Sequence, residues 1–216
     1  MNETADNADI LLEAEMIEAV IQRAGAPVHL VGHSFGGLSA LAVALRRPQL
    51  VQSLTILEAP APEILRHAGE DRHYEAFRTM TAAYFDAIKA GQCNAIERMI
   101  DFYGGAGTFA SWPQRVRDYA VETTAVNLLD WASAYGFAPT PSLLANMMTP
   151  TLVVRGENSH AAVKRANELL GQSIPGATIA TVPGAAHFMI ATHASELADL
   201  IASHVGIATH VSHAAS

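Results

Sequence analysis

Short apolar runs alternate with amphipathic stretches along much of this chain. Apolar residues recur at helical spacing over residues 8–24, and Gly25 with Pro27 marks the end of that helix. The run Val-His-Leu-Val at 28–31 is short and apolar, as is typical of a buried parallel strand. The pattern then predicts a helix over 37–47, which Pro48 ends.

The same alternation continues after this helix and returns near the end of the chain. Strands are predicted at 53–60, 150–156 and 177–184. Helices are predicted at 161–172 and near 195–205. Strands that alternate with helices indicate a parallel sheet with right-handed crossover connections, so the fold class is α/β.

Residues 62–146 have a different pattern, without strand-like runs and with helical spacing throughout. We therefore predict an α/β core formed by residues 1–61 and 147–208, a helical cap inserted at 62–146, and a frayed tail at 209–216. We expect most of the aromatic residues of this segment to form the cap's own core and a minority to face substrate. They are Tyr74, Phe77, Tyr84, Phe85, Phe102, Tyr103, Phe109, Trp112, Tyr119, Trp131, Tyr135 and Phe137.

Composition narrows the class of protein. Half of the 216 residues are hydrophobic and 16% are charged, which favours one sizeable folded core. The formal charge of −8 disfavours nucleic acid and anionic membranes as partners. Cys93, the single cysteine, excludes an internal disulfide. The acidic N-terminus does not resemble a signal peptide and no apolar run is long enough to span a membrane, so we expect a cytoplasmic protein.

Residues 32–36, Gly-His-Ser-Phe-Gly, match the pattern G-x-S-x-G. An apolar strand precedes the pattern and an apolar helix follows it, which is the context in which such a serine lies on a sharp strand-to-helix turn. The motif predicts Ser34 as a nucleophile, and the N–H of Phe35 as a donor to a developing oxyanion. The alternative is a tight turn with a purely structural role.

With this motif, the strand "LTILEAP", the run "PTLVVRGE" and the late "VPGAAHF", the chain resembles the α/β-hydrolase superfamily over roughly residues 8–205. The resemblance implies acyl transfer through attack of the serine on a carbonyl group, without metal or organic cofactor. Serine needs a base to take its proton. His187 follows the last predicted strand and comes after Ser34 in the chain, as the order serine, acid, histidine requires, and the resemblance indicates the same residue.

The acid departs from the superfamily pattern. Many relatives carry an aspartate three residues after the glycine that ends the "PTLVV" strand, where this chain has Ser159. Glu58 ends the strand that comes after the helix following Ser34, a position that carries the acid in some relatives. Glu157 lies in the loop where the acid is expected. Glu58 is the favoured acid and Glu157 the alternative; either would fix the histidine tautomer and stabilise its cation.

The predicted substrate is a small, fairly apolar acyl compound. Phe35 and Phe188 directly follow the predicted nucleophile and base, which makes them the side chains best placed to contact it. No spacing of His, Cys, Asp or Glu indicates a metal site. Nothing in the sequence separates an ester, lactone or thioester from a carbon–carbon bond beside a ketone.

Relatives begin with several strands before the strand that leads to the nucleophile. In this chain only one predicted helix precedes that strand, so we expect an N-terminally truncated version of the fold. The strand before Ser34 would then lie at the edge of the sheet, where it could pair with another copy of the chain. A second oxyanion donor would also be lost, at a cost of roughly 10²–10³ in rate. Three functions remain open: a serine hydrolase, a non-catalytic binding or dimerising remnant, and a lyase or acyltransferase on the same fold.

Overall fold

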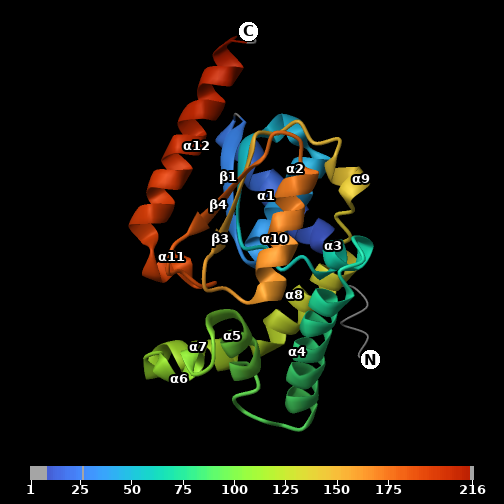
Figure 1. Cartoon of the computed structure of the whole chain (residues 1–216), viewed down its shortest axis with the longest axis vertical. Helices are drawn as coiled ribbons and strands as arrows, with labels where there is room; N and C mark the ends of the chain where they lie inside the picture. Colours follow the sequence, from blue (N-terminus) through green and yellow to red (C-terminus); the bar gives the residue numbers. More distant parts are fainter. Residues whose placement is uncertain (1–8, 26, 215–216) are drawn as a thin grey trace.

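A computed structural model describes residues 9–25 and 27–214 (Figure 1). Four parallel strands form its sheet in the order β1-β2-β3-β4. They are β1 (Val28–His33), β2 (Val51–Leu57), β3 (Thr151–Gly156) and β4 (Thr178–Val182). The predicted α/β class, with its parallel sheet, is confirmed. Each strand lies within a few residues of its predicted position.

Helices cover both faces of the sheet. On one face lie α1 (Ile10–Ala24), α2 (Phe35–Arg46) and α10 (Ala161–Ser173), and on the other lies α12 (Ala194–Ala214) (Figure 1). Successive side chains of a strand point to opposite faces. Val153 of β3 accordingly joins the core cluster that includes α2 and α10, and its neighbours Leu152 and Val154 join the cluster that includes α12.

Seven helices connect β2 to β3, and most of them gather at one end of the molecule (Figure 1). The aromatic side chains of this segment are buried or partly buried, except Tyr119, which is exposed. Phe77 packs against Phe102 and Trp131, with ring centroids 5.4 and 6.1 Å apart. The helices are α3 (Pro62–His67), α4 (Asp71–Lys89), α5 (Glu97–Gly104), α6 (Thr108–Ser111), α7 (Gln114–Glu122), α8 (Thr124–Gly136) and α9 (Pro141–Leu144).

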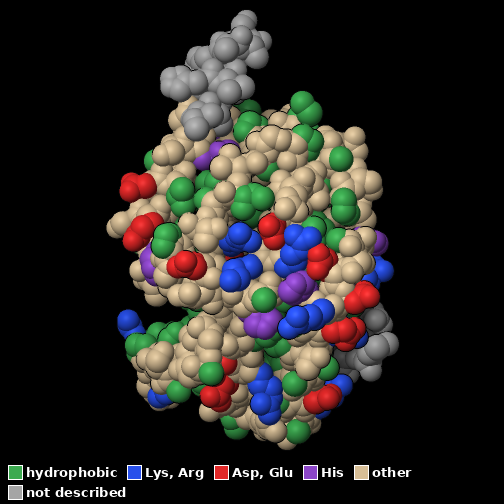
Figure 2. Space-filling view, viewed as in Figure 1, with side chains coloured by type: hydrophobic (Ala, Val, Ile, Leu, Met, Phe, Trp, Pro, Cys, Tyr) green, Lys and Arg blue, Asp and Glu red, His purple; other side chains and the backbone are tan. Residues whose placement is uncertain are grey.

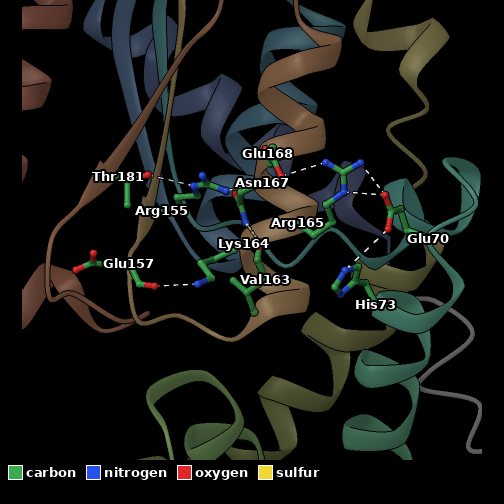
Figure 3. Close-up of polar contacts among 10 residues, drawn as sticks. All are labelled: Glu70, His73, Arg155, Glu157, Val163, Lys164, Arg165, Asn167, Glu168 and Thr181. Atoms are coloured by element: carbon green, nitrogen blue, oxygen red, sulfur yellow. Dashed lines mark hydrogen bonds and ion pairs between the residues drawn. The ribbon is translucent and has the colours of Figure 1, made fainter.

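A polar network joins this helical segment to the helix α10 that follows β3 (Figure 3). Arg165 of α10 donates from Nε to Glu70 Oε1 at 2.7 Å and from Nη1 to Glu168 at 3.0 Å. Glu70 precedes α4, and His73 lies one turn further along. The network belongs to a band of charged and histidine side chains across the middle of this face (Figure 2).

The final helix differs from its prediction. A short helix, α11 (Met189–Thr192), precedes α12, which continues to Ala214 instead of ending near residue 205. The predicted frayed tail, 209–216, overlaps the last residues of α12, and residues 215–216 and 1–8 lie outside the described residues. No proline occurs between 194 and 214, so the i to i−4 hydrogen bonds of the backbone can continue. No helix in the described ranges is both long and apolar enough to cross a membrane.

Within the described residues, β1 is an edge strand that pairs only with β2. Beside it, α1 and β1 border an apolar groove of about 610 Å³ lined by Ile17, Val20, Val28 and Leu30 among others. Val31 of β1 is 41% exposed. Pairing of this edge with a second copy stays a prediction.

Candidate active site

The turn between β1 and α2 holds Ser34 in a strained backbone conformation. Its φ is 54° and its ψ is −130°, a region that residues other than glycine rarely adopt. The Ser34 N–H donates to Leu57 O at 2.9 Å, which ties the turn to the end of β2. A strand therefore delivers the hydroxyl to the sheet's carboxyl edge, and a helix begins immediately after it.

The glycines around Ser34 have different roles. A Cβ on Gly32 would lie 2.3 Å from Gly36 O, so the close approach of β1 to α2 requires glycine there. A Cβ on Gly36 would meet no atom within 4 Å. The tight packing thus depends on the first glycine of the motif, and the second is sterically free.

The structure brings three predicted residues together at this edge. His187 Nε2 lies 3.0 Å from Ser34 Oγ, and His187 Nδ1 lies 3.0 Å from Glu58 Oε2. His187 comes from the loop between β4 and α11, and both its side chain and that of Glu58 are buried. A hydroxyl, an imidazole and a carboxylate are therefore linked in series, with the imidazole between the other two.

Glu58 is held by the backbone as well as by His187. It follows β2 with a φ of 48°, and its Oε1 accepts a hydrogen bond from Gly156 N at 2.6 Å. Its own N–H donates to Val154 O at 3.0 Å. Each carboxylate oxygen thus has a donor, which offsets the cost of burying the group without water.

The alternative acid lies elsewhere. Glu157 is exposed in the loop after β3, where its Oε2 accepts from Gly184 N at 2.8 Å. It is Glu58 that occupies the Nδ1 side of His187. Ser159 is buried close to Gly156, and its Oγ has no hydrogen-bond partner in the described residues.

His33 supports the loop that carries His187. Its Nε2 lies 2.8 Å from His187 O, and the two rings are 4.8 Å apart. Burial, followed by the nearby His187, lowers the pKa of His33 to about 4. At neutral pH the ring is therefore uncharged and donates its Nε2–H to the carbonyl, as expected for a residue that fixes backbone.

A small cavity of about 30 Å³ adjoins Ser34. Phe35 lines it together with Met99, Trp131 and Ala134, so most of its wall is apolar. Phe188 instead packs edge-on against Trp112, with ring centroids 4.9 Å apart, and edge-on against His187.

Sequence reasoning missed the polar part of the cavity wall. Asn127 and Asp130 of α8 line it, as does Tyr103 of α5, whose ring lies 4.1 Å from that of His187. Tyr103 was predicted only as one member of the aromatic set. No sequence motif marks Asn127 and Asp130, because it is the packing of α8 near the turn at Ser34 that brings them to the cavity.

The comparisons with known proteins agree with this architecture. The family model described as "Alpha/beta hydrolase family" matches residues 2–200. This chain belongs to the alpha/beta hydrolase family. Membership makes it a hydrolase enzyme by family.

Solved structures with the alpha/beta hydrolase fold resemble the chain at low identity. An esterase from Exiguobacterium antarcticum has a TM-score of 0.71 at 19% identity, over 94% of this chain and 75% of that one. Est816, described as an N-acyl homoserine lactone degrading enzyme, has a TM-score of 0.68 at 20% identity, over 94% of this chain and 77% of that one. A meta-cleavage product hydrolase from Pseudomonas fluorescens has a TM-score of 0.65 at 16% identity, over 93% of this chain and 72% of that one. At these identities, the matches show the fold alone.

This alpha/beta hydrolase has, in the described ranges, no group of three or more His, Cys, Asp or Glu side chains arranged to hold a metal ion.

Proposed function

We propose that this chain is a serine hydrolase that cleaves a small, fairly apolar acyl substrate through an acyl-enzyme on Ser34. The observation that carries the proposal is the series of contacts in which His187 lies 3.0 Å from both Ser34 Oγ and Glu58 Oε2. Nucleophile and base within hydrogen-bond distance, with a third group orienting the base, is the arrangement that activates a serine.

The hydrogen bonds assign a role to each group. The Glu58 carboxylate can only accept, so Nδ1 of His187 carries the proton and Nε2 is left as an acceptor for the Ser34 hydroxyl. When Ser34 Oγ attacks the carbonyl carbon, Nε2 takes the hydroxyl proton and passes it to the leaving alcohol as the old C–O bond breaks. Glu58 stabilises the imidazolium formed in between.

Water then completes the cycle. His187 removes a proton from water, the hydroxide attacks the acyl carbon, and the bond to Ser34 Oγ breaks with return of the proton to Ser34. Phe35 is the first residue of α2, where N–H groups lack partners within the helix. Its N–H is therefore the proposed donor to the oxyanion in both steps.

A fluorophosphonate probe, which reacts covalently with activated serines, tests this proposal. We expect labelling of the wild type and of Ser111→Ala, whose serine is exposed on α6, and none of Ser34→Ala. Glu58→Gln should slow labelling by at least a hundredfold, because a neutral amide cannot stabilise the imidazolium. Glu157→Gln, a matched change in the alternative acid, should label at the wild-type rate.

Three outcomes would contradict the proposal. Equal labelling of wild type and Ser34→Ala would remove Ser34 as nucleophile, and a folded wild type that is never labelled would favour a non-catalytic binding module. The open edge of β1 is the observation that supports that second function. Labelling without ester hydrolysis would favour a lyase or acyltransferase, which analysis of the products would identify.

A further inference from the structure

The cavity beside Ser34 is apolar along most of its wall but has a polar, acidic portion on α8. Asn127 and Asp130 lie three residues apart on this helix, hence on the same face, and both line the cavity that Ser34 also lines. The mechanism described above uses neither residue. Their position next to the acyl-binding space therefore needs its own explanation.

Asp130 has no cationic partner within ion-pair distance in the part of the chain that the structure describes. The groups that face it are Asn127 on its own helix, Glu13 of α1 and Tyr84 of α4. Burial and the charge of Glu13 raise the pKa of Asp130 to about 6, against a hydrogen bond with Asn127 that lowers it. At neutral pH, a partly buried carboxylate thus carries an unpaired negative charge beside the nucleophile.

Two further polar atoms of the cavity wall are buried and unpaired. Asn127 Oδ1 and the hydroxyl of Tyr103 have no hydrogen-bond partner within the described ranges, and Tyr103 is only 3% exposed. Burial raises the pKa of Tyr103 well above its ordinary value, so the phenol remains a hydroxyl. Buried polar atoms without partners are few in folded proteins, and three polar side chains with unused capacity around one cavity suit a polar ligand group.

We propose that this cavity selects small acyl groups that carry a protonated amine, and that Asp130 is the residue that binds the amine. An ammonium supplies three N–H donors and a positive charge, which match the acceptor Asn127 Oδ1 and the unpaired carboxylate. The cavity volume of about 30 Å³ favours a small acyl group, such as a glycyl unit. The inference rests on the proposed function, because the amine is placed relative to a carbonyl that Ser34 attacks.

A nearly isosteric substrate pair tests the selection. Glycine ethyl ester and ethyl propionate differ in an ammonium against a methyl group next to the same CH₂–CO unit, and ethanol release measures both. The quantity is the ratio of kcat/KM for the glycine ester to that for the propionate ester. We expect Asp130→Asn to lower this ratio about tenfold, the order expected for loss of a charge-assisted hydrogen bond.

The control removes a carboxylate of the same helical segment that does not line the cavity. Asp86→Asn breaks an exposed pair with Lys89 on α4 and should keep the wild-type ratio. The wild-type ratio should also fall as pH is lowered through about 6, where Asp130 takes up a proton.

The outcomes separate this inference from the proposed function. Cleavage of ethyl propionate that is lost in Ser34→Ala, with a ratio that Asp130→Asn leaves unchanged, would overturn the inference and leave the serine mechanism intact. Cleavage of either ester that persists in Ser34→Ala would overturn the proposed function itself. A ratio lowered by Asp130→Asn and unchanged by Asp86→Asn would support the assignment of Asp130.

Discussion

At the scale of a single residue, His33 contributes to the stability of the fold and contacts the loop that carries His187. Its pKa is lowered from 6.5 to about 4 in the folded protein, so the unfolded chain takes up a proton first as pH falls. The neutral ring therefore contributes stability above pH 6.5 that is lost progressively down to about pH 4. The full loss corresponds to about 3 kcal/mol, at about 1.4 kcal/mol for each pKa unit.

Urea unfolding between pH 7 and pH 4 measures this contribution. His33→Gln keeps an amide donor that can reach the His187 carbonyl but does not titrate, so its free energy of unfolding should fall less than that of the wild type over this range. The difference between the two proteins should shrink by up to about 3 kcal/mol as pH falls. If the free energies of unfolding of the two proteins fell in parallel with pH, the pKa of His33 would not be lowered in the folded state.

Residues whose place in the candidate site follows from their place in the chain could be predicted from the sequence. Ser34 lies in a motif, and Glu58 and His187 directly follow predicted strands, whose carboxyl ends meet at one edge of a parallel sheet. Strand position favours Glu58 over Glu157 as the acid, and Glu58 Oε2 lies 3.0 Å from His187 Nδ1. Asp130 could not be found in this way, since only the packing of α8 brings it to the cavity.

At the scale of elements, the junction of β1 with α2 offers a prediction with a built-in control. Gly32→Ala places a Cβ 2.3 Å from Gly36 O, so strand and helix must separate, and we expect a loss of about 3 kcal/mol in the free energy of unfolding. Gly36→Ala meets no atom within 4 Å and lies in a helix, where alanine is favoured by about 0.5–1 kcal/mol. Urea unfolding of the two variants should therefore show changes of opposite sign.

Strands and their adjoining helices were easier to predict than the helices of residues 62–146. The strand β3, for example, is a mostly apolar run that begins after Pro150 and ends at Gly156. Bounds of α4 to α9 were not predicted, because several of these helices lack a side-chain N-cap and packing of their aromatic side chains holds them instead. The end of α12 was missed because its last residues carry no apolar period.

At the scale of the whole molecule, the sheet has an unpaired edge next to an apolar surface. β1 presents backbone N–H and C=O groups that β2 does not use, and Val31 of β1 and Met16 and Val20 of α1 are exposed beside it. Such an edge is a template for pairing with another strand. The loop that carries His187 follows β4, at the other end of the strand order, but His187 itself reaches Ser34 and His33 at the carboxyl end of β1.

We therefore expect the protein, whose chain mass is 22.9 kDa, to sediment as a dimer or larger species at micromolar concentration. Val31→Lys places a charge on the edge and should shift it toward the monomer, since lysine on an edge strand opposes pairing. Val126→Lys makes the same change at an exposed position of α8 and should leave sedimentation unchanged. A wild type that remains monomeric at every concentration would contradict pairing at β1, because a bare edge with an apolar border would then be stable in water by itself.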